Sequence, residues 1–156
     1  MATAVAEMMS LDGFVAGPAD EVEHLFGWYG NGDVAVPAPG SPVTFRTSEA
    51  SAGHLRDLIE NIAAVVSGRR MFESAVSQAK AVAGDGIVGV GGASIAQQCL
   101  NAGLLDEIRV NLVPVLLGGG IRFFDNLAVA PAPLRGPRVI EGKGVTHLYY
   151  RVSSPA

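Results

Sequence analysis

A short apolar strand followed by a glycine turn and a helix is the feature that most constrains the fold of this chain. Residues 87–90 predict the strand, residues 91–94 read Gly-Gly-Ala-Ser, and residues 95–102 predict a helix with one apolar face. A long apolar stretch, residues 106–120, opens on two acids and ends in three glycines. A strand, a helix and a strand in this order indicate an α/β protein.

The glycine turn has the form of an anion site. Gly91 and Gly92 leave the backbone N–H groups open to a ligand, and the dipole of the following helix favours negative charge there. The match to G-x-G-x-x-G is incomplete, because Ser94 replaces the third glycine. A dinucleotide site also requires an acid at the end of the next strand, whereas residues 106–107 lie at the start of that strand. A tight turn without a ligand is therefore the alternative.

The bulk properties narrow the function classes. The 156 residues suit a single domain over residues 1–156, and 49% of them are hydrophobic. The net charge of −4 argues against a general nucleic-acid binder. The N-terminal residues have no basic segment typical of a signal peptide, and no apolar run is long enough to span a membrane. We therefore expect a cytoplasmic protein.

The potential metal ligands are few and scattered. His24, His54 and His147 do not have metal-ligand spacing, and Cys99 is the sole cysteine. No zinc or other metal site is expected. Cys99 falls on the apolar face of its helix, which indicates a buried thiol rather than a nucleophile. We expect His147 to be a paired surface or interface residue rather than a base.

The remaining elements follow from periodicity and turn residues. The aromatic residues of the long loop have two interpretations, a functional loop or one anchored to the core. The expected elements are strands at 2–9, 63–67 and 107–117, extended pieces at 14–16 and 121–124, a loop at 17–42 around a short helix at 20–25, helices at 51–60 and 71–83, and a hairpin of 138–141 with 145–152.

Taken together, the motifs resemble the dihydrofolate reductase-like superfamily, and most closely the reductase domain of the bifunctional riboflavin-pathway deaminase-reductase with its stand-alone relatives. The ordered set is stronger than any single motif and spans nearly the whole chain. The motifs are Met-Ser-Leu-Asp-Gly-Phe-Val-Ala-Gly at 9–17, Gly-Arg-Arg-Met-Phe-Glu at 68–73, Gly-Gly-Ala-Ser-Ile at 91–95, Ala-Gly-Leu-Leu-Asp-Glu at 102–107, Pro-Val-Leu-Leu-Gly-Gly-Gly at 114–120, Phe-Phe-Asp at 123–125 and Gly-Val-Thr-His-Leu-Tyr-Tyr at 144–150.

The resemblance implies a three-layer fold, with a mainly parallel twisted sheet, flanking helices, a C-terminal antiparallel hairpin and NADPH across the carboxyl edge. Two guanidinium groups at a helix start suit a 2′-phosphate, although solvated arginines are the alternative. Residues 4–6 are expected beside the nicotinamide. The implied cofactor-binding residues are Ala6; Gly68, Arg69, Arg70 and Met71 near the adenosine phosphate; and Gly91, Gly92, Ala93, Ser94 and Ile95 at the pyrophosphate.

The resemblance also implies the residues of the substrate side. Ser10 and Asp12 are the catalytic candidates, and Leu11 and Gly119 are expected to contact the substrate. Asp12 would position the substrate or relay a proton. Alternatively, Asp12 is a turn residue that bonds its own backbone.

Two departures from the family pattern matter. Residues 13–28 do not reproduce the acidic helix with which dihydrofolate reductases hold a pterin, so folate is a doubtful substrate. Relatives also carry a further strand where Glu73 here runs directly into Ser74. Either the strand is truly deleted in this protein or a segment is omitted there. We favour the omitted segment, and therefore expect Cα atoms much farther apart than the ~3.8 Å of a trans peptide.

Two functions compete. The first is an NADPH-dependent reductase of a small metabolite, for which the nearest chemistry is reduction of the ribosylamino-pyrimidine of riboflavin synthesis. The second is a non-catalytic nucleotide-binding module with the same fold. No deaminase motif is present. The resemblance implies a homodimer, and the strand face that carries His147 and Tyr149 is the expected interface.

Overall fold

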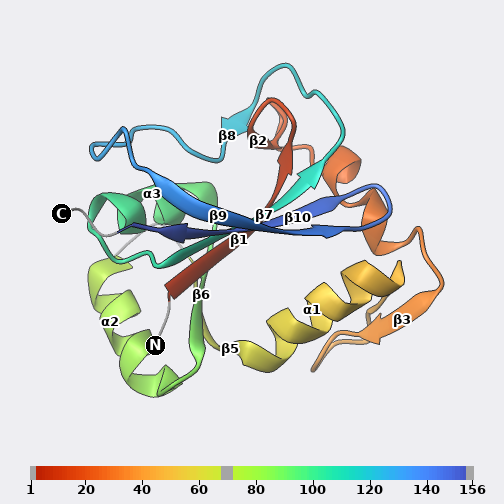
Figure 1. Ribbon diagram of the computed structural model, residues 1–156, viewed down its shortest axis with the longest axis horizontal. Coiled ribbons are helices and arrows are strands. Elements are labelled where there is room, and N and C mark those ends of the chain that lie inside the picture. Colours follow the sequence, from red (N-terminus) through yellow and green to blue (C-terminus); the bar gives the residue numbers. More distant parts are fainter. Residues whose placement is uncertain (1–2, 68–71, 154–156) are drawn as a thin grey trace.

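The computed structural model describes the backbone of residues 3–67 and 72–153. Figure 1 shows a twisted central sheet with helices on both sides. The elements in chain order are β1 (Thr3–Ser10), β2 (Phe14–Ala16), the 3-10 helices η1 (Glu23–Leu25) and η2 (Gly27–Tyr29), β3 (Val34–Pro37), β4 (Thr44–Thr47), α1 (Glu49–Asn61), β5 (Ile62–Ser67), α2 (Phe72–Ala83), β6 (Ile87–Gly91), α3 (Ala93–Asn101), β7 (Glu107–Val113), β8 (Ile121–Arg122), β9 (Leu134–Glu141) and β10 (Thr146–Val152).

The central sheet confirms the expected α/β class. Its strand order is β5-β6-β1-β7-β10-β9. The first four strands are parallel, and β10 and β9 run antiparallel as the predicted C-terminal hairpin. β1 lies in the middle of the parallel part, as its apolar sequence predicts for a buried strand. The parallel strands bring their carboxyl ends to one edge, where the site is expected.

Two apolar cores lie on opposite faces of the sheet. Alternation along β10 directs Leu148 and Tyr150 into the core formed with α2 and α3, and His147 and Tyr149 toward α1. Phe123 and Cys99 are fully buried in the first core. Leu25 and Trp28 belong to the second core, together with residues of α1. Within the described residues, no helix is long and apolar enough to cross a membrane.

The loop predicted over residues 17–42 contains more structure than expected. β3 forms an antiparallel hairpin with β4, pairing Val34 with Thr47. The alternation of this hairpin is short and interrupted by prolines, which hid it in the sequence. The anchored interpretation of the aromatic residues is confirmed for Trp28, which is 3% exposed and meets the His147 ring edge-on at 5.1 Å. Tyr29 packs on Phe45 of β4.

The prediction that a segment is missing between Glu73 and Ser74 is wrong. α2 runs without interruption from Phe72 to Ala83, so Glu73 and Ser74 are consecutive residues of one helix. The sequence allows this because Ala75, Val76 and Ala79 keep helical spacing toward the first core. The helix predicted over residues 71–83 is therefore continuous, and β5 is an edge strand of the sheet.

Candidate active site at the carboxyl edge of the sheet

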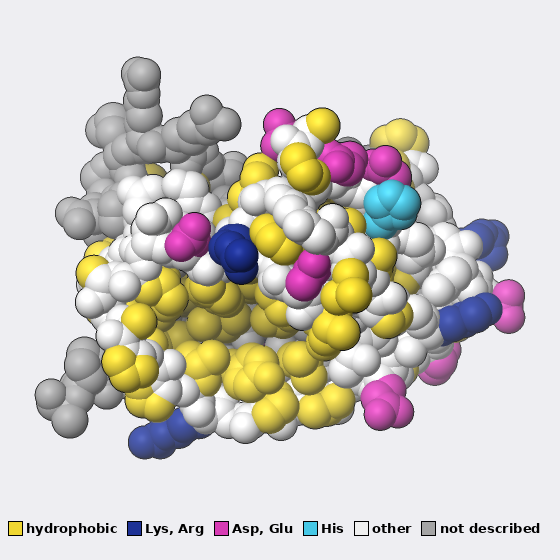
Figure 2. Space-filling view, turned by 90° about the horizontal axis from the view of Figure 1, so that it is seen from above, with side chains coloured by type: hydrophobic (Ala, Val, Ile, Leu, Met, Phe, Trp, Pro, Cys, Tyr) yellow, Lys and Arg dark blue, Asp and Glu magenta, His cyan; other side chains and the backbone are white. Residues whose placement is uncertain are grey.

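The carboxyl ends of the parallel strands β1, β5, β6 and β7 lie at one edge of the sheet, where the expected site residues follow them. Ser10, at the end of β1, is level with Val113, at the end of β7. On the other side of β1, β6 ends at Gly91, which is level with Ser67 of β5. Figure 2 looks onto the side of the molecule that carries β2 and β8, which is hollowed where hydrophobic side chains gather. Motifs far apart in the sequence thus share one edge.

Ser10 and Asp12 form a clamp between two loops. The Ser10 hydroxyl is fully buried, donates to Asp12 Oδ1 at 2.5 Å and accepts from the Phe14 N–H at 3.0 Å. The Asp12 carboxylate accepts from the Leu117 N–H at 3.1 Å and the Gly118 N–H at 2.7 Å. The clamp therefore ties the turn after β1 to the glycine loop after β7.

These contacts define what Asp12 can do. The hydrogen bond from Ser10, followed by those from Gly118 and Leu117, lowers the pKa of Asp12. The carboxylate is therefore charged near neutral pH, which suits an acceptor that positions a donor rather than a proton donor. Ser10 has no surface exposure, so its hydroxyl orients Asp12 instead of meeting a ligand.

The two expected substrate residues flank this clamp. Leu11 is 63% exposed, and its N–H donates to the Val115 carbonyl. Gly119 lies against Pro18. The neighbouring Gly120 has φ +129, and a Cβ there would fall 2.0 Å from the Ala16 carbonyl oxygen, so only glycine allows this approach. An exposed apolar side chain beside a fixed carboxylate is available for contact with a small molecule.

The helix start expected to hold pyrophosphate is present. Gly92 precedes α3 with φ +100, and no heavy atom of the described chain lies within 4 Å of a Cβ built there. The first N–H groups of α3 lack intrahelical partners by geometry, as in any helix. Ala93 and Ile95 are buried beneath the turn. The turn is therefore an open cradle suited in shape and polarity to an anion.

A carboxylate of the chain itself reaches this cradle. Glu7 Oε1 of β1 accepts from the Gly92 N–H at 2.7 Å. Burial raises the pKa of Glu7, and the Gly92 hydrogen bond partly opposes that rise. Sequence analysis did not select Glu7. Glu7 is the single charged residue of this largely apolar strand, and that was the available signal, because a buried acid requires a partner.

The remaining cofactor candidates are only partly placed. Gly68, Arg69, Arg70 and Met71 lie outside the described residues. Ser67, directly before them, ends β5 beside Gly91. Ala6 lies in β1 level with Arg109 of β7, two strands from β5.

His147 is not a surface residue, which corrects that expectation. It is fully buried, with Nε2 2.9 Å from the Ser51 hydroxyl and Nδ1 2.7 Å from Asn111 Oδ1. Because the Asn111 oxygen can only accept, Nδ1 carries the proton and Nε2 accepts from Ser51. The expected pairing is confirmed. The face with His147 and Tyr149 packs against α1, so it is not a free dimer interface.

Cys99 is fully buried, as its position on the apolar helix face predicted. Burial raises the pKa of its thiol, which is therefore a poor nucleophile. Across the described part of the chain, no group of three or more His, Cys, Asp or Glu side chains is arranged to hold a metal ion.

The sheet order and the glycine turn at its carboxyl edge define a dihydrofolate reductase-like α/β protein. The chain belongs to the RibD C-terminal domain family, whose model matches residues 33–139. That match covers the β3–β4 hairpin, the parallel βα units and the start of the terminal hairpin. No curated protein sequence matches the chain significantly.

Solved structures share the fold at low sequence identity. A putative riboflavin biosynthesis protein from Shewanella sp. PV-4 has a TM-score of 0.64 and 17% identity, over 98% of this chain and 99% of that one. The Thermotoga maritima deaminase/5-amino-6-(5-phosphoribosylamino)uracil reductase has a TM-score of 0.59 and 11% identity, over 97% and 56%. Dihydrofolate reductase from Enterococcus faecalis, complexed with NADP(H), has a TM-score of 0.54 and 9% identity, over 97% and 96%. The chain thus spans about half of the bifunctional protein.

Proposed function

We propose that this protein is an NADPH-dependent reductase of the riboflavin-biosynthesis type. The observation that carries the proposal is the open glycine cradle at the start of α3, on the same sheet edge as the Ser10–Asp12 clamp. One end of that edge offers N–H groups to an anionic cofactor, and the other offers a fixed carboxylate. Membership of the RibD C-terminal domain family supports a reductase-type activity.

The cradle fits the pyrophosphate of a dinucleotide. The N–H groups of Ser94 and Ile95 would bind its oxygens, and the missing Cβ of Gly92 leaves space beside them. Glu7 would have to withdraw or take up a proton, since two anions on one helix start repel each other. Arg69 and Arg70 are proposed partners of a 2′-phosphate. Bound NADPH supplies a hydride, and the protein supplies its orientation.

The proposed substrate is 5-amino-6-(5-phosphoribosylamino)uracil or a related small metabolite. Its ribose C1 would accept the hydride as the bond between C1 and the ring oxygen breaks, and that oxygen would take up a proton from water to give the ribityl chain. Asp12 would accept a hydrogen bond from a substrate hydroxyl or amino group and so orient C1 toward the nicotinamide. Leu11 would cover the apolar side of the substrate and exclude water.

The first test is a titration of the purified protein with NADPH and with NADH, followed by cofactor fluorescence. Tight binding of NADPH, weaker binding of NADH and loss of that preference in Arg69→Ala and Arg70→Ala would support the cofactor assignment. Arg46→Ala, an exposed arginine of β4, is the matched control. Steady-state oxidation of NADPH with the ribosylamino-pyrimidine then tests the substrate, and no turnover despite tight binding would refute it.

A non-catalytic nucleotide-binding module is the second candidate, and one observation favours it. Both catalytic candidates take part in the clamp, with the Ser10 hydroxyl fully buried. Such a module would bind NADPH without turning over any reducible substrate. Turnover with a panel of carbonyl and imine compounds separates the two functions.

We also propose a homodimer, with an interface other than the one first expected. Leu134 and Val139 of the edge strand β9 are 40% and 51% exposed, whereas His147 is fully buried. Edge strands with exposed apolar residues readily pair with another chain. Solution scattering at micromolar concentration is expected to give twice the mass of one chain, and a monomeric mass would contradict the proposal.

A further inference from the structure

A pocket lies at the opposite edge of the sheet from the glycine cradle. It has a volume of about 580 Å³ and lies between the end of α1 and the strands β7, β9 and β10. Glu107, the first residue of β7, lines this pocket, whereas Val113 ends β7 at the carboxyl edge. Six residue steps at ~3.3 Å separate the two ends by roughly 20 Å. The end of the pocket at Glu107 is therefore distant from the Ser10–Asp12 clamp, whereas Arg109, which also lines the pocket, is level with Ala6 of β1.

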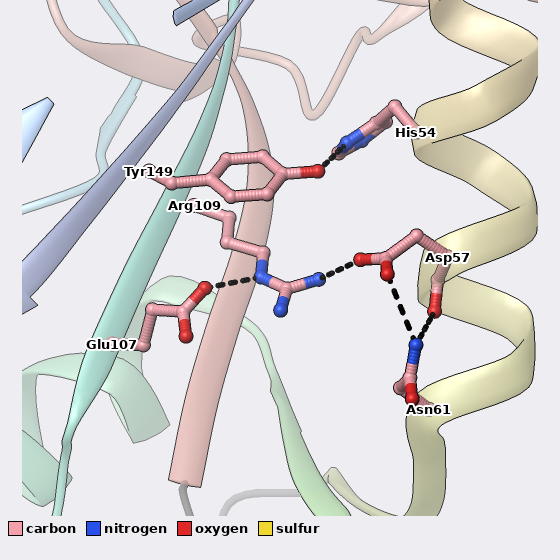
Figure 3. A network of polar contacts seen from close by, with 6 residues as sticks. All are labelled: His54, Asp57, Asn61, Glu107, Arg109 and Tyr149. Carbon is pink, nitrogen blue, oxygen red and sulfur yellow. Dashed lines mark hydrogen bonds and ion pairs between the residues drawn. The ribbon is translucent and has the colours of Figure 1, made fainter. Parts of the chain in front are cut away.

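The floor of this pocket is a buried arginine. The Arg109 side chain is 6% exposed, and its Nε donates to Glu107 Oε1 at 2.6 Å. Its Nη1 lies 3.5 Å from Asp57 Oδ2 but has no hydrogen-bond partner among the described residues. Figure 3 shows Glu107 and Asp57 on either side of the guanidinium, with Asn61 bonded to Asp57. Arg109 is thus held in place by two carboxylates, and its Nη1 is itself buried.

Tyr149 fixes a second arginine beside the first. The Arg109 guanidinium carbon lies 4.7 Å from the Tyr149 ring centroid, and that of Arg138 lies 5.3 Å from it. The Tyr149 hydroxyl contacts His54 Nδ1, which limits rotation of the ring (Figure 3). Cation–π contacts therefore hold both guanidinium groups against one fixed ring. Such preorganisation lowers the entropy that an anion must lose on binding.

The residues that line this pocket have a net positive charge, whereas the chain as a whole is negative. Four arginines and two carboxylates are among its lining residues, which leaves an excess of two positive charges. The chain as a whole has a net charge of −4. Arg135 and Arg151 complete the set of arginines and are exposed, so their guanidinium groups are free to reorient toward a ligand. Guanidinium groups match phosphate oxygens in geometry.

We propose that this pocket binds a small phosphate monoester. A dianionic phosphate would neutralise the excess of two charges and take hydrogen bonds from the exposed arginines Arg135, Arg138 and Arg151, whereas a carboxylate would leave one charge uncompensated. The volume accommodates a metabolite larger than phosphate alone, within the usual range of small-molecule sites. The ligand would contact β7 and β10, the strands that also reach the carboxyl edge.

The test is isothermal titration calorimetry of the full chain with phenyl phosphate, inorganic phosphate and benzoate. We expect phenyl phosphate to bind at least about tenfold more tightly than benzoate. The double variant Arg135→Ala/Arg138→Ala is expected to weaken phenyl phosphate binding by about tenfold or more. Both residues are exposed, so the variant is expected to fold. The control Arg46→Ala/Arg56→Ala removes the same charge outside the pocket and is expected to change affinity less than about twofold.

Three results would overturn the proposal. The first is no binding of phenyl phosphate at millimolar concentration. The second is equal affinity for benzoate and phenyl phosphate. The third is equal loss of affinity in the pocket and control variants, which would indicate a general charge effect. Repeating the titration with saturating NADPH checks the location, because competition between NADPH and phenyl phosphate would assign the phosphate to the carboxyl edge instead.

Discussion

His54 and His147 stack on each other inside the protein, with ring centroids 3.9 Å apart and planes inclined by 15°. His54 comes from α1 and His147 from β10, so the stack joins the helix to the sheet. Both rings are buried. Burial, the second ring and the nearby Arg109 lower the pKa of His54 to about 3, and burial lowers the pKa of His147 to about 4. The stack therefore requires two neutral imidazoles.

This stack predicts loss of stability in mild acid. Both pKa values lie below the 6.5 of an unfolded histidine, so between pH 6.5 and about 4 the unfolded chain binds more protons than the folded one. The free energy of unfolding therefore falls as pH decreases through that window, by at most about 1.4 kcal/mol per pH unit for each ring. Urea unfolding at pH 8, 7, 6 and 5 measures the slope.

Substitutions of single histidines test whether the His54–His147 stack causes this pH dependence of the free energy of unfolding. His54→Gln and His147→Gln are each expected to flatten the pH dependence between pH 5 and 6.5, even though they lower stability at pH 8 by removing buried contacts. His24→Gln, at an exposed histidine of η1, is expected to leave the slope unchanged. Equal slopes in the unmodified protein and in the three variants would contradict the prediction that the buried His54 and His147 rings cause the pH dependence.

Asp12→Asn is expected to loosen the glycine loop. The amide side chain keeps one oxygen acceptor in place of the carboxylate that now receives the Leu117 and Gly118 N–H groups. We expect faster hydrogen exchange at both N–H groups and lower reductase turnover. Asp33→Asn, an exposed acid elsewhere, is the control. Unchanged exchange with lost turnover would assign Asp12 to direct substrate contact alone.

Glu7→Gln is expected to strengthen NADPH binding. Glu7 places negative charge at the start of α3, where the pyrophosphate is proposed to bind. Removing that charge is expected to lower the NADPH dissociation constant about two- to fivefold, the equivalent of one charge at a helix end. Cofactor fluorescence measures the change, and Glu60→Gln on α1 is the control. Weaker binding in Glu7→Gln would show that Glu7 supports the cofactor site instead.

Phe123→Ala is expected to destabilise the protein strongly. The Phe123 ring is fully buried in the core beneath α3 and stacks near Phe124. Its removal leaves a cavity, at a cost of about 3–5 kcal/mol in the free energy of unfolding. Val82→Ala, at an 80% exposed position of α2, is expected to cost less than about 0.5 kcal/mol. Urea unfolding of both variants at pH 8 makes the comparison.

The sequence predicted the parallel part of the fold because those signals are local. Residues 87–102 combine a buried apolar strand, two glycines and a helix with one apolar face, and the structure has β6 and α3 in this place. The same holds for α1, whose apolar spacing begins after the capping serine, Ser48. The β3–β4 hairpin was missed because prolines interrupt its short alternation.

The sequence by itself determined the strand segments of the central sheet, the glycine cradle and the family resemblance, because periodicity and backbone requirements act over a few residues. Only the tertiary structure decided which side chains meet. Glu7 reaches Gly92 across 85 positions, Asp12 reaches Gly118 across 106, and His54 meets Tyr149 across 95. Strand order and register set these contacts, because a buried polar group pairs with the partner that packing brings to it, whatever the distance along the chain.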